Sequence, residues 1–223
     1  MQLSPILISM KTASVAIALT FLLGLFLARW IVKMKSEKAK MVLDGILTLP
    51  LVLPPTVMGF FLLLVFGVNT PFGKFLLEFF GVRIVFSWTA TVIAAVVISF
   101  PFMYRSARGA FEQVDENLIM AARTLGMSEG RIFWRIIMPL ALPGVVAGGI
   151  LAFARGLGEF GATAMIAGNI ADRTRTLPLA IYAEVAAGNM HTASYYVIIV
   201  LVISFVVVVS TNYFAIRERK YLK

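Results

Sequence analysis

The sequence predicts an all-α membrane protein with five transmembrane helices, and three observations support this fold class. First, 60% of the 223 residues are hydrophobic and 14% are charged, which is too few charges to cover the surface of a water-soluble domain. Second, the apolar residues gather into runs long enough to cross lipid. Third, the runs lack the polar-apolar alternation of barrel strands, so each is expected to be a helix that satisfies its own backbone hydrogen bonds.

Five apolar runs approach or exceed the roughly 20 residues that a helix needs to cross ~30 Å of hydrocarbon. They cover residues 6–32, 46–66, 84–103, 140–167 and 194–216. A shorter apolar segment at residues 177–187 contains Glu184, which leaves open a sixth helix that is short or re-entrant. The first run is interpreted as a retained helix, because it is too long for a signal peptide and no small-residue cleavage site follows it.

The basic residues predict how the helices are oriented. Most of the 20 Lys and Arg residues follow the first, third and fifth runs, and the cytoplasmic flanks of transmembrane helices are enriched in these residues. This distribution places the N-terminus outside and the C-terminus in the cytoplasm. Residues 1–223 form one membrane domain without an internal repeat. Five helices are few to enclose a path, so a two-fold homodimer is expected.

Composition also excludes several classes of function. The net charge is +9, but the basic residues flank apolar runs instead of forming the continuous basic surface that binds nucleic acid. The chain has no cysteine and one histidine, so we expect neither a thiolate site nor a multi-histidine metal cluster. It also lacks the G-x-x-x-x-G-K-[ST] phosphate loop, so any ATP would be hydrolysed by another subunit. No catalytic residue, metal or cofactor is assigned to this chain.

The most informative segment is the basic loop at about residues 105–142. Asp115 is expected to cap a short helix that ends at Gly126, a residue suited to the left-handed conformation. Ser128 starts a second helix, which is expected to end before Pro139. Two adjacent alanines give the first helix a face that another protein can approach closely. The alternative is an ordinary basic loop with an apolar helix lying on the membrane surface.

This loop resembles the signature of ABC importer permeases, in which Glu-Ala-Ala is followed by glycine and later by Ile-x-Leu-Pro. The matching positions are Met120, Ala121, Ala122, Gly126, Ile136, Met138 and Pro139. Methionine stands in place of the signature's glutamate and leucine. The resemblance implies that this loop docks into a cleft of an ATPase subunit, where Arg123 is a candidate partner for acidic groups.

Two further segments, residues 50–64 and 153–163, narrow the resemblance to the molybdate permeases, with sulfate and tungstate permeases as near relatives. It implies a non-catalytic permease subunit of an ATP-driven importer in the plasma (inner) membrane. It also implies a second copy of the chain, two ATPase subunits and an extracytoplasmic molybdate-binding protein as partners. The alternatives are a sulfate or tungstate permease, and a standalone secondary carrier that works without ATP.

The same two segments contain the candidate translocation path. Proline removes a backbone donor and bends a helix, and irregular backbone in a membrane is tolerated where it lines an aqueous cavity or is buried in protein. Arg155 and Glu159 are one helical turn apart and can pair inside the fourth run. The candidate path residues are Pro54, Pro55, Arg155, Gly158, Glu159 and Gly161. A packed kink and a structural ion pair remain the alternative interpretations of these residues.

Overall fold

The computed structural model describes the backbone of residues 2–221 and the side chains of residues 2–210. The described residues form helices and connecting segments without a strand, which confirms the all-α class. Four helical stretches are long and apolar enough to cross a membrane. They are α1 (Ser4–Val32), α5 (Trp88–Glu112), the stretch that ends with α8 (Met138–Leu157), and the first part of α11 (Met190–Tyr221).

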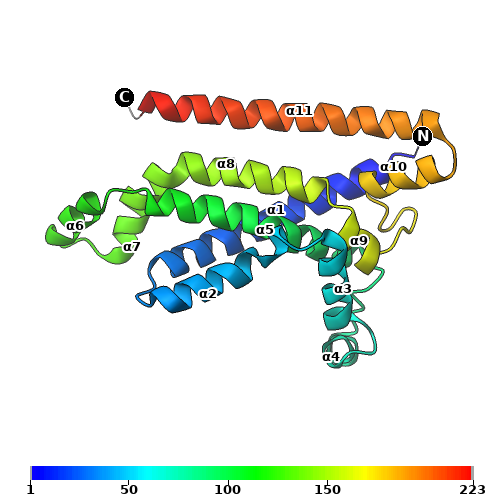
Figure 1. Cartoon of the computed structure of the whole chain (residues 1–223), viewed down its shortest axis with the longest axis horizontal. Helices are drawn as coiled ribbons and strands as arrows, with labels where there is room; N and C mark the ends of the chain where they lie inside the picture. Colours follow the sequence, from blue (N-terminus) through cyan, green and yellow to red (C-terminus); the bar gives the residue numbers. More distant parts are fainter. Residues whose placement is uncertain (1, 222–223) are drawn as a thin grey trace.

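These long helices run roughly along the same direction, as Figure 1 shows. α5 is the central element, since it packs against both α1 and α8, and α11 packs against α8. The short helices α6 (Glu116–Thr124) and α7 (Glu129–Ile132) lie at one end of the molecule. The opposite end holds α9 (Gly161–Ile166) and α10 (Leu177–Ala186).

The second apolar run is broken rather than gently bent. It consists of α2 (Glu37–Thr48), a 3₁₀ turn (Leu49–Leu51) and α3 (Pro55–Phe66), and the two parts meet at 109°. Pro54 precedes α3 and Pro55 is its first residue. Proline is favoured in the first turn of a helix, but in a helix interior it removes a backbone hydrogen bond, so the chain cannot stay helical from α2 into α3. Counting the pair as one span gives the expected five. α4 (Pro71–Phe80) lies at the tip of α3 (Figure 1).

The predicted end of the third run at residue 103 was wrong. α5 begins after Ser87, whose hydroxyl accepts a hydrogen bond from the Ala90 amide at 3.4 Å, and it continues to Glu112. The apolar pattern ends where charged residues begin, but the helix continues, because these charged residues stabilise its last turns. The Arg108 Nε lies 2.9 Å from the Glu112 Oε1, an i,i+4 ion pair.

The second loop helix was expected to end before Pro139, and this was also wrong. α7 passes through a π-helical turn (Phe133–Ile137) directly into α8, which has Pro139 in its first turn. A wider turn accommodates a residue that cannot donate to the ladder, so the chain stays helical across the proline. The segment that was expected to be a loop is therefore continuous with a membrane-spanning helix over Glu129–Leu157.

The fourth apolar run breaks at its far end. α8 ends at Leu157, and α9 starts again at Gly161. The segment left open as a short or re-entrant sixth helix is α10, whose ten residues span only about 15 Å at 1.5 Å per residue. α10 is therefore too short to cross the bilayer.

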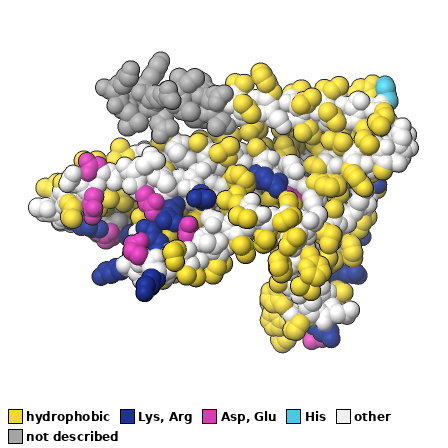
Figure 2. All heavy atoms as spheres, viewed as in Figure 1, with side chains coloured by type: hydrophobic (Ala, Val, Ile, Leu, Met, Phe, Trp, Pro, Cys, Tyr) yellow, Lys and Arg dark blue, Asp and Glu magenta, His cyan; other side chains and the backbone are white. Residues whose placement is uncertain are grey.

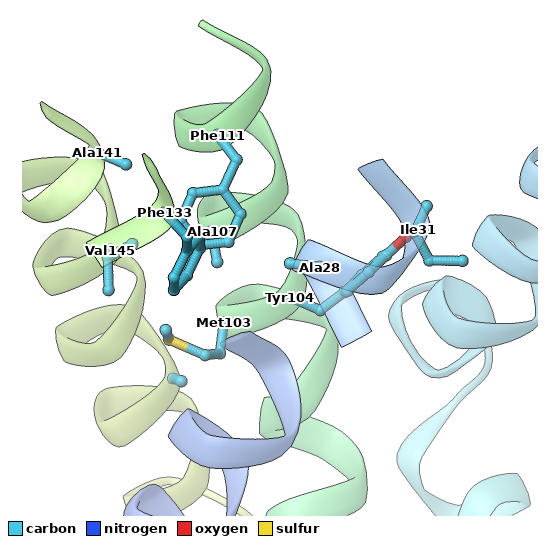
Figure 3. Packing of buried hydrophobic residues seen from close by; sticks show 10 residues of the cluster. Ala28, Ile31, Met103, Tyr104, Ala107, Phe111, Phe133, Ala141 and Val145 are labelled. Carbon is cyan, nitrogen blue, oxygen red and sulfur yellow. The ribbon is translucent and has the colours of Figure 1, made fainter. Parts of the chain in front are cut away.

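The long helices pack closely against one another. Side chains from α1, α5, the π-helical turn and α8 converge in one buried cluster that includes Ile31, Tyr104, Phe133 and Val145 (Figure 3). Small residues let the backbones approach, since a Cβ at Gly24 would meet the Met103 side chain at 2.6 Å. The charged side chains gather at the end formed by α2, α6 and α7, whereas hydrophobic side chains cover α3 (Figure 2).

Candidate translocation and coupling site

The break between α8 and α9 is organised by one buried carboxylate. Glu159 is only 2% exposed. Its Oε2 lies 2.8 Å from the Arg155 Nη1, and its Oε1 accepts a hydrogen bond from the Ala162 amide at 2.8 Å. One carboxylate therefore pairs with the last turn of α8 and caps the first turn of α9, while Gly158 ends α8. The ion pair expected from the i,i+4 spacing is present.

α9 is seated against the first turns of α3. A Cβ at Gly161 would lie 3.1 Å from the Pro55 Cβ, and a Cβ at Gly59 would lie 2.9 Å from the Ala162 Cα. These contacts bring five of the six candidate path residues to one place, where two broken helices meet. Pro54 is exposed at the entrance to α3. Broken helices that meet inside a membrane protein are the usual setting of a transport path.

Polar contacts join α1 to α5 inside the bundle. The hydroxyl oxygens of Thr12 and Thr91 are 2.9 Å apart, and the Trp88 indole donates to Thr12 at 3.0 Å. Deeper in the bundle, the hydroxyl oxygens of Thr20 and Ser99 are 3.2 Å apart. Hydrogen bonds between helices fix their register where lipid supplies no hydrophobic driving force for association.

A second polar cluster, which sequence reasoning missed, joins α2 to α5. The buried Tyr104 hydroxyl donates to the Asp44 Oδ1 at 2.9 Å, and Arg108 donates to the same oxygen. Arg108 also pairs with Glu112, and the Lys40 Nζ lies 3.3 Å from the Glu112 Oε1. The cluster fixes the first half of the broken span to the central helix. Its signal in the sequence is weak, because only the i,i+4 pair within α5 is a local pattern.

The expected coupling segment forms a compact unit. The Asp115 carboxylate accepts from the Asn117 amide at 2.9 Å and caps α6, and Gly126 ends the turn with a φ of +75°. The Arg123 Nε lies 2.8 Å from the Glu129 Oε1, and the Lys33 Nζ lies 3.4 Å from the Glu129 Oε2. The hydrogen bond to Glu129 raises the pKa of Arg123. Glu129 thus ties α6 to the end of α1.

This unit exposes apolar side chains at the most highly charged end of the molecule. Leu125 is 81% exposed, Trp134 65% and Met120 52%. Ala121 is exposed and Ala122 is buried, while Ile136 lies in the π-helical turn and Pro139 at the start of α8. Exposed apolar groups rimmed by charged residues are typical of a protein interface.

The family of the chain follows from a match that covers most of its sequence. The model of the family "Binding-protein-dependent transport system inner membrane component" matches residues 20–220. The chain belongs to this family. It is therefore an inner-membrane transport component, and the family implies a substrate-binding protein and an ATPase as partners.

Two similar relatives are molybdenum transport system permease proteins called ModB. The relative from Escherichia coli (strain K12) is 46% identical over 177 residues, which cover 79% of this chain and 77% of the relative. The relative from Haemophilus influenzae is 43% identical over 182 residues, which cover 82% of this chain and 79% of the relative.

Solved structures support the fold. A bacterial ABC transporter that imports the acidic polysaccharide alginate matches with a TM-score of 0.79 at 15% identity, covering 99% of this chain and 80% of the other. The MetNI methionine ABC transporter in an inward-facing conformation matches with a TM-score of 0.67 at 19% identity, covering 94% of both chains. The helix arrangement is therefore that of ABC importer permeases.

Proposed function

We propose that this chain is the membrane-spanning permease subunit of an ATP-driven importer of molybdate. The observation that carries the proposal is the 46% identity to a molybdenum transport permease across 79% of the chain. The proposed assembly contains two copies of this chain, two ATPase subunits that bind ATP, and an extracytoplasmic molybdate-binding protein. In this assembly the N-terminus of the chain lies outside and α6 faces the cytoplasm.

The proposed coupling surface is α6 with the following π-helical turn. Its exposed apolar side chains, Leu125 and Trp134, need a partner at the end of the molecule that is richest in charge. Motion of a docked ATPase subunit would reach the membrane through two direct links. One is the continuous helix from Glu129 to Leu157, and the other is the contact of Glu129 with Lys33 at the end of α1.

The proposed path follows α8 to its break. Arg155 is partly exposed and supplies positive potential for a dianion, while Glu159 holds the guanidinium in place and keeps the local net charge near zero. A neutral pair attracts an anion weakly, so the anion would not be trapped inside the membrane. Tungstate and sulfate are tetrahedral dianions like molybdate, so a path of this kind discriminates poorly among them. Selection then falls to the binding protein.

Uptake of labelled molybdate tests the proposal, in cells that lack their own high-affinity system and express this chain with its ATPase and binding protein. We expect uptake that requires this chain, survives excess sulfate and is competed by tungstate. Abolition by sulfate, or entry of labelled sulfate instead, would move the chain to the sulfate permeases. Unchanged uptake without the ATPase subunit would favour a secondary carrier.

A further inference from the structure

A pocket of about 610 Å³ opens between α5, α6 and α8, at the same end of the molecule as the coupling segment. Its polar lining consists of the side chains of Arg105, Ser106, Gln113 and Asp115. Gly109 also lines it, and a Cβ there would meet nothing within 4 Å, whereas Gly144 marks a close approach of α8 to α5, since a Cβ there would lie 2.8 Å from the Ala110 Cβ.

Arg105 is one of several described basic residues at this end without a carboxylate partner, and it is the one that lines the pocket. Arg108, Arg123, Lys33 and Lys40 each pair with a carboxylate. Among the residues whose side chains the structure describes, no ion pair or hydrogen bond engages the Arg105 guanidinium, and the Ser106 hydroxyl and Gln113 amide are equally free. A guanidinium, a hydroxyl and an amide together offer the donors that bind a tetrahedral oxyanion.

The pocket lies in line with the proposed path. Gly144 and Ala147 line the pocket, and Leu151 and Arg155 follow on α8 at intervals of four residues. Residues spaced three or four apart share one face of a helix. Arg155 is therefore on the pocket's face of α8, about 12 Å beyond Ala147 along the axis at 1.5 Å per residue. Arg105 and Gly109 similarly share one face of α5, and Gln113 follows directly after the end of this helix.

Asp115 also lines the pocket, and its negative charge opposes an anion. Its carboxylate accepts the Asn117 amide as the cap of α6, so it is held at the pocket rather than free to turn away. An oxyanion beside both Arg105 and Asp115 is attracted and repelled at once. Such a site binds weakly, as a place of release requires.

We propose that this pocket is the release site of the transported oxyanion at the cytoplasmic end of the path. The proposal rests on the proposed function for the identity of the anion. Arg105, Ser106 and Gln113 provide the donors, and Asp115 keeps the affinity low.

Two substitutions, one that removes a positive charge and one that removes a negative charge, test the proposal. Arg105→Gln removes the cation and should weaken oxyanion binding roughly ten- to thirtyfold, because one charge about 4–6 Å from a dianion contributes about that factor even at the dielectric constant of water. Asp115→Asn removes the repulsion and should tighten binding by a similar factor. Asparagine caps a helix as well as aspartate does, so α6 should stay intact. Lys38→Gln removes an exposed charge from α2 outside the pocket and should change nothing.

Binding would be measured by equilibrium dialysis of labelled molybdate against the complete permease–ATPase complex, without nucleotide or binding protein, in nanodiscs of zwitterionic lipid. Equal binding by all four proteins, or weaker binding by Asp115→Asn, would overturn the release site. Asp115→Asn is expected to tighten binding, so the test remains decisive even if Arg105→Gln assembles poorly.

Further measurements separate three alternatives: sulfate as the cargo, molybdate transport without this site, and lipid phosphate as the ligand of the pocket. Sulfate binding with the same dependence on Arg105 and Asp115, without molybdate binding, would retain the site and reject molybdate as the cargo. Conversely, intact molybdate uptake in cells with equal binding by all variants would retain the proposed function and reject the site. Loss of molybdate binding when anionic phospholipid is added would show that the pocket binds lipid phosphate, and would also overturn the release site.

Discussion

A single carboxylate performs two structural tasks at the break between α8 and α9. Glu159 pairs with Arg155 through one oxygen and caps α9 through the other. Because Glu159 is buried, removing its cation leaves an uncompensated charge, and this is more costly than removing both charges together.

Arg155→Ala should therefore lower the free energy of unfolding by about 3 kcal/mol, the typical cost of breaking a buried ion pair. The double variant Arg155→Ala/Glu159→Gln should recover part of this loss, since the amide oxygen can still accept from the Ala162 amide. Denaturant titration of the purified chain in mixed micelles measures both values. Equal stability of the single and double variants would show that the Glu159 charge needs no partner.

Spacing along the sequence predicted contacts between residues close in the chain, but not contacts between distant residues. The Arg155–Glu159 pair and the left-handed Gly126 follow from patterns within a few residues. The contact of Asp44 with Tyr104 joins residues 60 positions apart. No pattern within α2 or α5 specifies that the two helices lie side by side, so this contact required the structure.

Among the elements, α3 and α9 approach each other most closely at Gly59. A Cβ at Gly59 would lie 2.7 Å from the Met165 Cβ and 2.9 Å from the Ala162 Cα, whereas a Cβ at Gly45 on α2 would meet nothing within 4 Å. Backbone cannot move aside as a flexible side chain can, so α3 itself must shift.

Gly59→Ala should lower the free energy of unfolding by roughly 1–3 kcal/mol through overpacking. Gly45→Ala is the matched control and should raise it by up to about 1 kcal/mol, because alanine favours a helix over glycine. Thermal unfolding of both variants in the same detergent compares them. Matching midpoints for the two would mean that α3 and α9 are not in close contact.

Hydropathy predicted that the elements exist but not where they end. It identified all five apolar runs, yet it placed the end of the third run nine residues before Glu112, the last residue of α5. Pro139 was interpreted as a stop signal, and the π-helical turn before it instead let the helix continue. Both errors arise because charged residues and prolines end an apolar pattern without ending a helix.

On the scale of the whole molecule, the positive-inside rule assigns the two ends to the two sides of the membrane. The natural absence of cysteine allows a direct test with single cysteines. Ala171→Cys lies in the exposed segment between α9 and α10, and Lys35→Cys lies between α1 and α2. An impermeant maleimide applied to intact cells should label position 171 and not position 35. Disruption of the cells should then expose position 35, and the reverse pattern would invert the topology.

The angle between α2 and α3 has a mechanical consequence. α3 has 12 residues and is about 18 Å long at 1.5 Å per residue. Because its axis stands at 109° to that of α2, rotation of α2 about its own axis moves the far end of α3 sideways. A turn of α2 by about 10° about its own axis would sweep the far end of α3 through an arc of about 3 Å, given that length. A straight span would only spin in place, so a small rotation at one face of the membrane would become a sideways displacement near the other.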